Sequence, residues 1–320
     1  MTTGTAVALA PAVAAAPSGA TPELSKHVMH MPAKQGRGVG TQSAGSGGHT
    51  GDFTVDGWPD ILARQQNNGD LKVYPHSRTF NGIFTYQPAT TINFNWSGQR
   101  WIGQGRMAGG MVGEPRNIAD VVSIGFDGVM RVHRHSGTFN GTSTLQSSMV
   151  ISTGWNINDL VFIFDLDADG WDDVMARRAG TGDTYVYFHS GTPSGFDTLL
   201  PPQLLISGGE ADRDQLMADV TMDGVPDLVF LEDQFLAVFD PVTDVSYLLG
   251  TGWNTINAVA LTDVNLDGRP DILGRVAANG NLQVYLHSGI WAPDANDIAF
   301  STYQSVVLLG FNWFVNDVIT

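Results

Sequence analysis

Aspartate residues recur in this chain at a spacing that suits the binding of a divalent cation. Four segments fit the pattern D-x-x-x-D-G-x-x-D followed by two apolar residues, and they begin at Asp52, Asp165, Asp219 and Asp263. Ca²⁺ takes roughly six to eight oxygen ligands from carboxylates, backbone carbonyls and water. The glycine permits the sharp bend that brings the last aspartate towards the others. The pattern therefore predicts four calcium loops.

The expected metal ligands are the side chains at the first, third, fifth and ninth positions of each loop. They are Asp52, Asp56 and Asp60; Asp165, Asp167, Asp169 and Asp173; Asp219, Asp223 and Asp227; and Asp263, Asn265, Asp267 and Asp271. The carbonyls of Trp171 and Arg269 are expected to complete two of the sites. Thr54 and Thr221 occupy the third position of the other two loops. Those two sites should be weaker, because a hydroxyl replaces an anionic or amide oxygen.

The loop differs from an EF-hand, because it lacks the glutamate at position 12 and lies between strands. The alternative to a metal site is an Asp/Gly turn that caps backbone amides. Four copies of the loop at equivalent positions of the repeat favour up to four structural Ca²⁺ ions, each stabilising the turn between two strands.

Each acidic loop belongs to a longer repeat that predicts four short strands. The first strand runs into the loop, and apolar residues such as those after Asp60 form the second. Alternating segments, LKVYPHS at Leu71, TYVYFHS at Thr184 and LQVYLHS at Leu282, form the third. A run such as TYQSVVLLG near Thr302 forms the fourth. Alternation of Val and Tyr with polar residues is typical of half-buried strands.

The spacing of the repeats predicts a β-propeller. Asp165 and Asp219 are 54 residues apart, and Asp219 and Asp263 are 44 apart. A weaker copy starting at Ala119 keeps the strands without the acidic loop, which makes five units. Units of roughly 40 to 50 residues with four strands suit propeller blades. An open solenoid is the alternative, but it would need capping repeats.

The two ends of the array predict how the ring closes. Gly310-Phe311-Asn312 resembles the Gly-Trp-Asn strings at Gly154 and Gly252, but the chain ends at Thr320 before another acidic loop begins. The missing continuation is the start of the first unit at Asp52. We therefore expect an all-β, five-bladed propeller of four-stranded blades, closed by pairing of the C-terminal strand with the N-terminal blade, which protects both edges.

The repeats resemble FG-GAP/VCBS repeats of secreted bacterial β-propellers of the actinobacterial type. The acidic loops, the Gly-Trp-Asn strings and the aromatic third strands carry the resemblance, which covers roughly residues 51–320. It implies a calcium-dependent propeller. Its functional implications are broad, because such propellers serve as lectins, adhesins and accessory modules of exported enzymes. The targeting component of a secreted toxin assembly is also implied by this analogy alone.

Two sets of residues are candidates for ligand binding. An Arg-Tyr-His constellation occurs in three units, as Arg64, Tyr74 and His76; Arg177, Tyr187 and His189; and Arg275, Tyr285 and His287. In the second unit Ser123 or a neighbour replaces the arginine, and the fourth unit has Leu231. The second set pairs tryptophan with asparagine: Trp155 and Asn156, Trp253 and Asn254, and Asn312 and Trp313. Both sets suit a sugar pocket between blades. Both also suit interblade hydrogen bonding and packing.

Composition and charge exclude several classes of function. The net charge of −16 argues against a nucleic-acid partner, because phosphate binding needs clustered Lys and Arg. No apolar run is long enough for a membrane span. The sequence contains no G-x-S-x-G, H-E-x-x-H or cysteine nucleophile, so we expect no enzyme. A hydrolase with an unrecognised site is the weakest hypothesis.

The first 50 residues predict export and a linker. Residues 1–20 are rich in Ala and Val and resemble the end of a signal peptide. We expect residues 21–48 to form a flexible linker in which His27 and His30 are solvated, and residues 49–320 to form the propeller. The chain contains no cysteine, so calcium rather than disulfides would cross-link an exported protein.

These observations predict a secreted, calcium-stabilised, lectin-like propeller that binds carbohydrate on a cell surface or polymer. Several equivalent sites on a rigid disc would gain avidity on a polyvalent surface. The alternative is a protein–protein interaction scaffold or an accessory module of an exported enzyme complex. Neither sugar nor partner is specified by the sequence.

Overall fold

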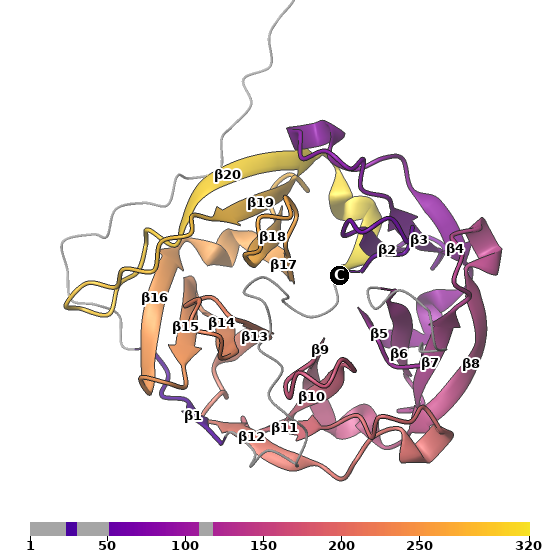
Figure 1. The fold of residues 1–320 in the computed structure, drawn as a ribbon, viewed down its shortest axis with the longest axis horizontal. Helices are drawn as coiled ribbons and strands as arrows, with labels where there is room; N and C mark the ends of the chain where they lie inside the picture. The colour runs from indigo at the N-terminus through magenta and orange to yellow at the C-terminus, as the bar shows by residue number, and fades with distance from the viewer. Residues whose placement is uncertain (1–23, 31–50, 109–117) are drawn as a thin grey trace, which may run out of the picture.

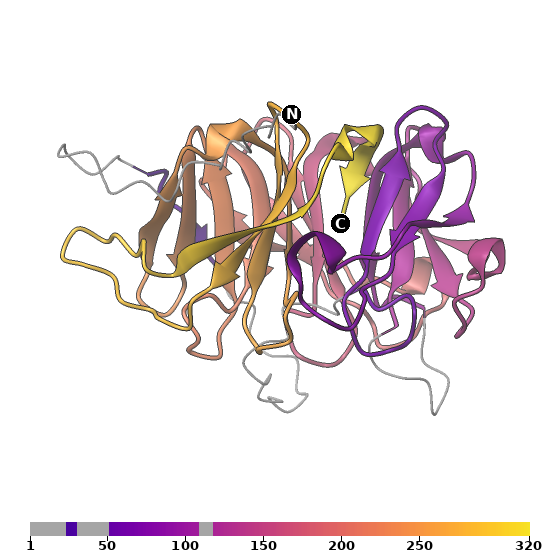
Figure 2. The ribbon, with the colours of Figure 1, turned by 90° about the horizontal axis from the view of Figure 1, so that it is seen from above.

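The computed structural model describes residues 24–30, 51–108 and 118–320. Within these residues the chain forms five antiparallel four-stranded sheets arranged in a ring, and one sheet gains a fifth strand (Figure 1). Seen from above, the strands of neighbouring sheets stand side by side (Figure 2). The five-bladed propeller expected from the repeats is therefore confirmed.

Each blade follows one sequence repeat. Blade 1 contains β21 (Asn316–Ile319), β2 (Ile61–Gln65), β3 (Leu71–Tyr74) and β4 (Thr90–Asn93). Blade 2 contains β5 (Gln99–Gly105), β6 (Asp120–Gly125), β7 (Met130–His135) and β8 (Leu145–Ser152). Blade 3 contains β9 (Asn158–Phe164), β10 (Asp173–Arg178), β11 (Thr184–Tyr187) and β12 (Gln203–Ser207).

The last two blades have the same order. Blade 4 contains β13 (Asp212–Ala218), β14 (Asp227–Glu232), β15 (Phe235–Asp240) and β16 (Val245–Thr251). Blade 5 contains β17 (Ile256–Thr262), β18 (Asp271–Val276), β19 (Leu282–His287) and β20 (Tyr303–Gly310).

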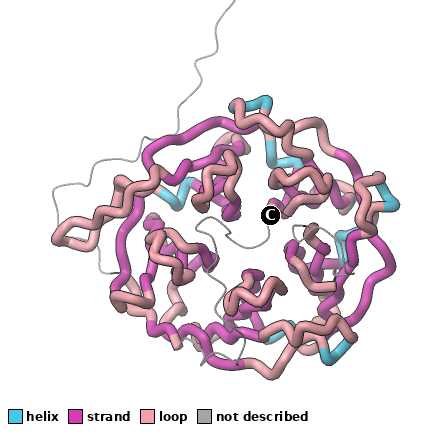
Figure 3. Tube along the Cα trace, in the orientation of Figure 1, coloured by secondary structure: helices cyan, strands magenta, loops and turns pink. Residues whose placement is uncertain are grey.

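Short 3₁₀ turns are the only helices in the described residues, and Figure 3 shows them between the strands. Three lie between the third and fourth strands of a blade: η1 (Gly82–Phe84), η3 (Gly141–Ser143) and η5 (Gly195–Asp197). Four start a new blade: η2 (Trp96–Gly98), η4 (Trp155–Ile157), η6 (Trp253–Thr255) and η7 (Trp313–Val315). No helix in these ranges is long and apolar enough to cross a membrane.

The ring closes as the two ends of the array predicted. The C-terminal strand β21 pairs with β2, with Ala63 opposite Ile319. Leu62 and Thr320 exchange two backbone hydrogen bonds of 2.9 Å each. Blade 1 therefore takes its innermost strand from the end of the chain, which leaves neither strand unpaired.

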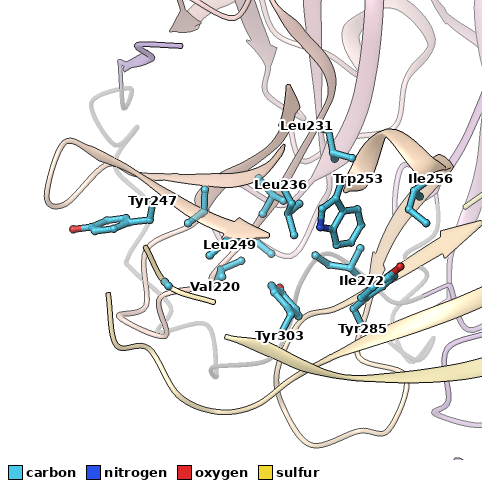
Figure 4. Packing of buried hydrophobic residues seen from close by; sticks show 14 residues of the cluster. Val220, Leu231, Leu236, Tyr247, Leu249, Trp253, Ile256, Ile272, Tyr285 and Tyr303 are labelled. Carbon is cyan, nitrogen blue, oxygen red and sulfur yellow. The ribbon is translucent and has the colours of Figure 1, made fainter. Parts of the chain in front are cut away.

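The hydrophobic core is divided among the spaces between neighbouring blades. Each of the five buried clusters combines residues of two adjacent blades. Figure 4 shows the cluster between blades 4 and 5, where Leu231 and Leu236 of blade 4 meet Trp253, Ile272 and Tyr285. Side chains along a strand point alternately to the two faces of the sheet, so each face of a blade packs against one neighbouring blade.

Part of the expected linker belongs to the propeller. Residues Leu24–His30 lie against blade 3, where β1 (Val28–Met29) pairs with β12. His27 is 4 % exposed, so its expected place in a solvated tail is wrong. Residues 1–23 and 31–50, which include the signal-like stretch, lie outside the described residues.

Candidate functional site

The four acidic loops share one backbone conformation. The residue before the fifth position has φ between 55° and 62° in each loop: Val55, Ala168, Met222 and Leu266. The glycines at the sixth position of the loops, such as Gly170, have φ between 86° and 90°. In each loop the first aspartate accepts hydrogen bonds from two backbone amides; Asp165, for example, accepts them from Asp169 and Gly170 at 3.1 and 2.9 Å. The same sequence signal thus produces the same turn four times.

The third loop brings three carboxylates together. One oxygen each of Asp165, Asp167 and Asp173 lies within 4.8 Å of the other two. Asp169, the fourth expected ligand, uses Oδ1 to accept the amide of Trp171 at 2.9 Å and is outside this group of three. Burial, followed by the nearby Asp172 charge, raises the pKa of Asp165 to about 7. Burial also raises the pKa of Asp173 well above its usual range. Clustered carboxylates in a half-buried turn favour a cation that offsets their charge.

The first and fourth loops contain side-chain oxygens that fit an additional ligand. Within the described residues, Thr54 Oγ1 and Thr221 Oγ1 are buried and have no hydrogen-bond partner. Both are the third-position oxygens of their loops, where a metal would take a ligand. A buried hydroxyl without a partner costs about 1–3 kcal/mol, so two at equivalent positions indicate a missing common partner.

The ninth-position aspartates connect each loop to the third strand of its blade. Asp60, Asp173 and Asp271 each accept the backbone amide of a histidine, at 2.8, 2.8 and 2.9 Å. Burial raises the pKa of Asp60 and Asp271 to about 7. In blade 4 a proline, Pro241, follows β15 near the equivalent position, and a proline has no amide hydrogen. There Asp227 Oδ1 has no partner among the described residues, and burial raises the Asp227 pKa to about 8.

Blade 2 retains the ninth-position aspartate of the acidic loop, Asp120. Asp120 accepts the amide of His135 at 2.8 Å, as the ninth-position aspartates do elsewhere. It also accepts the amides of Met107 and Ala108 at 3.1 and 2.6 Å. Residues 109–117 of this loop lie outside the described part of the chain.

The three histidines of the Arg-Tyr-His constellation bind the preceding blade. Nε2 of His76, His189 and His287 lies 3.0–3.1 Å from a carbonyl oxygen, of Val264, Met107 and Val220 respectively. A carbonyl only accepts, so each histidine donates from Nε2. His135 of blade 2 makes the same bond to Phe53 at 3.1 Å. Burial lowers the pKa of His76, His189 and His287, which favours the neutral imidazole in each of these hydrogen bonds.

The three arginines bind the following blade. Arg177 donates from NH1 to the carbonyls of Gly209 and Asp212, both at 2.6 Å, where blade 4 begins. Its Nε lies 2.9 Å from Asp159 of its own blade. Arg64 bonds in the same way to Trp96 and Gln99, and Arg275 to Trp313 and Asn316. These contacts support the alternative interpretation, an interblade hydrogen-bond cluster.

The other two blades supply an arginine from a different strand, which sequence analysis missed. In blades 2 and 4 the arginine position holds Ile124 and Leu231, judged from the strand register. Arg100 and Arg213, at the second position of the first strand, bond instead to carbonyls of the next blade, those of Asn158 and Ile256. Each of the five joints thus contains a guanidinium that bonds to a backbone carbonyl of the following blade. The signal was present as an Arg in β5 and β13 where the other blades have Asp or Asn.

The tryptophans that begin four blades are buried between blades. Trp96, Trp155, Trp253 and Trp313 are 2–6 % exposed. The centroid of each ring lies 4.4–4.9 Å from that of the third-strand ring of the blade that it begins; Trp155, for example, packs on Tyr187. This burial argues against direct sugar stacking on Trp155 and Trp253. Asn156, Asn254 and Asn312 are exposed.

The last tryptophan aligns differently from our expectation. The left-handed residue that precedes the turn is Gly154, Gly252 and Asn312 in three blades. Trp313 is therefore equivalent to Trp155, and Phe311 occupies the position of Thr153 and Thr251 rather than that of Trp155. Phe311 is 56 % exposed.

A hollow between blades 5 and 1 contains three of the expected ligand-binding residues. Its volume is about 270 Å³, and its lining includes Tyr74, Gln87, Phe311, Asn312 and Trp313. The Tyr74 and Trp313 rings lie 4.4 Å apart, and the Tyr74 hydroxyl accepts the side-chain amide of Asn316 at 3.1 Å. Packed rings, one open aromatic face and exposed amides therefore converge at one joint.

Comparisons with known proteins give low similarity. No protein-family model matches, and no curated protein matches. One similar structure is the Photorhabdus luminescens Tc holotoxin pore, with 13 % identity and a TM-score of 0.42; the match covers 92 % of this chain and 13 % of that one. Another is an Agrocybe aegerita lectin specific for non-reducing terminal N-acetylglucosamine, with 15 % identity and a TM-score of 0.41, covering 90 % and 81 %. The FG-GAP/VCBS resemblance is not confirmed by these matches.

Proposed function

We propose that this protein is a calcium-stabilised propeller that binds carbohydrate without catalysis. The observation that carries the calcium part is the convergence of Asp165, Asp167 and Asp173 within 4.8 Å. The partnerless hydroxyls of Thr54 and Thr221 support it in two further loops. A bound ion would supply positive charge between the first two strands of a blade. The left-handed turn of the loop would hold the ligand oxygens of the aspartates in position.

Comparison of two third-position variants tests the calcium proposal. Asp167→Ala removes an anionic ligand, whereas Thr54→Ala removes a hydroxyl, so Asp167→Ala should weaken binding more. We expect saturable Ca²⁺ binding by calorimetry and a fall in melting temperature on chelation. Asp127→Ala is the control, since this exposed carboxylate pairs with Arg131 in blade 2. Absence of calorimetric binding and an unchanged melting temperature with chelator would refute the proposal.

The carbohydrate part rests on the hollow between blades 5 and 1. Its volume of about 270 Å³ is near the lower end of the roughly 300–1,000 Å³ of small-molecule sites, which suits one sugar residue. The exposed ring of Phe311 can cover the C–H face of a sugar. The amides of Gln87 and Asn312 can bond to its hydroxyls. We propose this hollow, rather than the buried Trp155 and Trp253, as the sugar site.

A glycan array with matched variants tests the sugar site. Phe311→Ala should weaken binding of the retained glycan at least tenfold, because it removes the open aromatic face. Phe126→Ala is the control, since Phe126 is 69 % exposed on a different blade. Gln87→Ala should also reduce glycan binding, and its melting temperature is measured alongside because the side-chain amide of Gln87 also donates to the His76 carbonyl at 3.3 Å. The proposal fails if no glycan is retained in the presence of calcium, or if both phenylalanine variants lose binding equally.

We further propose that the protein works outside the cell, where calcium is abundant enough to fill weak sites. The two threonine-containing loops are expected to need the roughly 10⁻⁴–10⁻³ M range that extracellular modules use. Fractionation of the native producer tests this: the protein should be recovered from the medium or cell surface, and recovery from the cytoplasm alone would contradict it.

A further inference from the structure

The segment Leu24–His30 is bound to the propeller as an extended peptide. Val28 and Met29 pair with Ser207 and Ile206 of β12, and the amide of His30 donates to the Leu205 carbonyl at 2.6 Å. The backbone amide and hydroxyl of Ser25 each donate to the Glu232 carboxylate at 2.9 Å. Main-chain pairing at a sheet edge combined with side-chain pockets is how many peptide-binding domains bind their ligands.

The pocket for His27 is buried between blades 3 and 4. His27 Nε2 lies 2.8 Å from Asp212 Oδ2, and both side chains are fully covered. The His27 ring centroid lies 4.2 Å from that of Phe230. Gly208 allows the approach, because a Cβ there would clash with the Lys26 carbonyl oxygen. The pocket thus encloses the His27 ring and bonds its Nε2, while His27 Nδ1 and Asp212 Oδ1 are buried without a partner among the described residues.

Blade 4 departs from the repeat in ways that create this site. It begins with Gly208-Gly209 and has no tryptophan in its turn. The third-strand ring of this blade, Phe239, therefore lacks the tryptophan that packs on the equivalent ring in the other four blades. His27 lies beside Phe239 instead, at 6.2 Å. Blade 4 also has a short β15–β16 turn. In blades 1, 2 and 3 the corresponding connection carries η1, η3 or η5, which packs on the outer strand of the preceding blade. The outer strand β12 is covered by β1 instead.

The remaining outer strand, β16, is covered by the chain itself. Leu248 bridges to Ile298, and the amide of Leu248 donates to the Asp297 carbonyl at 2.9 Å. Among the described residues, β12 is therefore the outer strand whose cover comes from a segment that precedes the five sequence repeats. The 20 residues 31–50 connect that cover to blade 1.

We propose that the joint between blades 3 and 4 is a docking site for an extended peptide, and that a second copy of this chain can supply it by exchanging Leu24–His30. Twenty residues can span at most about 70 Å. A compact chain of this length has a diameter of about 50 Å, calculated from its expected radius of gyration. The connection is therefore long enough to reach a neighbouring molecule. Such an exchange produces dimers from contacts that the monomer already contains.

A full-chain variant with a weakened segment tests the site. His27→Ala leaves Asp212, Phe230 and β12 intact but removes the side chain that fills the pocket. A labelled synthetic peptide of residues 22–32 should bind this variant saturably. It should bind the wild-type chain at least tenfold more weakly, because the tethered segment competes at a high effective concentration. The same peptide with the His27→Ala change should not bind. Val28→Pro, at a 50 % exposed position, is a second acceptor variant.

Mixing two complementary variants tests the exchange. His27→Ala retains the site, and Asp212→Ala retains the segment, so the mixture should form a heterodimer by light scattering while each variant alone stays monomeric. Circular dichroism and melting temperature confirm that each variant folds. The proposal is overturned if the peptide binds the wild type and both acceptor variants equally. It is also overturned if the mixture stays monomeric at concentrations where the peptide saturates its site.

Discussion

At the scale of single residues, small departures from the repeat decide local chemistry. The third-strand position that faces the tryptophan holds Tyr74, Tyr187 and Tyr285 in three blades but His133 in blade 2. His133 packs 4.4 Å from Trp96, and its Nε2 lies 3.2 Å from Ser123 Oγ. Burial, together with the charge of Arg131, lowers the His133 pKa to about 4. The histidine at this position therefore makes its own contribution to the acid sensitivity of the protein, in addition to those of His76, His189 and His287.

His133→Tyr should remove this acid sensitivity. In the unfolded chain the imidazole has the ordinary histidine pKa of 6.5, whereas in the folded chain it stays neutral down to about pH 4. The stability of the wild type should therefore fall as pH drops through that window. The variant should be similar to wild type at pH 7.5 and more stable by up to about 3 kcal/mol at pH 4, from about 1.4 kcal/mol per pKa unit. Urea unfolding at several pH values measures it.

The reverse substitution in blade 3 is the matched control. Tyr187→His places a histidine against Trp155 and should introduce the same loss of stability as the pH falls below the ordinary histidine pKa. A stability difference between His133→Tyr and wild type that does not change with pH would contradict this account.

At the scale of elements, the blades are joined by polar contacts as well as by packing. A guanidinium from one blade bonds to carbonyls where the next blade begins, at all five joints. The arginine stands on the second strand in blades 1, 3 and 5, and on the first strand in blades 2 and 4. Antiparallel neighbours on one sheet can exchange this role, because their side chains meet across the ladder. The requirement is a buried donor at the joint, whichever strand supplies it.

Arg177→Met should destabilise the protein by about 3 kcal/mol. The substitution keeps most of the buried stem but removes the donor to the carbonyls of Gly209 and Asp212 and the partner of Asp159, and loss of a charged donor at a buried joint is costly. Arg178→Met is the control: this neighbour lies over the Tyr185 ring at 4.6 Å, and its loss should cost less than about 1 kcal/mol. Chemical denaturation measures both. Equal effects would show that Arg177 contributes no more than surface packing.

At the scale of the whole molecule, closure of the ring unites the blades into one cooperative structure. Strand β21 supplies the innermost strand of blade 1, and the Arg275 guanidinium bonds to its first residue. The hydrophobic cluster between blades 5 and 1 includes Ile319 and Trp313 from the end of the chain. Loss of this strand would expose an edge and part of a core at once.

A disulfide across the closure should stabilise the ring. Ala63 and Ile319 are opposite each other, and the flanking pair Leu62–Thr320 carries the hydrogen bonds. A non-hydrogen-bonded antiparallel pair has the short Cα separation that a disulfide needs. The chain contains no other cysteine, so Ala63→Cys with Ile319→Cys gives a single possible bond. The oxidised form should exceed the reduced form of the same protein by about 2–5 kcal/mol. Equal stabilities of the two forms would contradict this prediction.

Much of the architecture could be predicted from the sequence, because each repeat contains its own turn and strand signals. The Asp-Gly loops, the alternating third strands and the truncated last unit specified five blades and their closure. The candidate metal loops were located for the same reason, since their ligands are close in the sequence. The Phe311 offset was missed because Gly310 resembles a blade-starting glycine, whereas the residue that adopts the left-handed conformation is Asn312.

By itself, the sequence determined what depends on neighbouring residues: the repeated turn, the strand order and the positions of the acidic side chains. Only the tertiary structure decided what depends on which blades touch. It placed Arg177 and His189 on opposite neighbours, buried Trp155 between blades, and brought His27 to Asp212 across 185 residues. The physical reason is that a blade buries its two faces against other blades, and those contacts leave no local pattern in the chain.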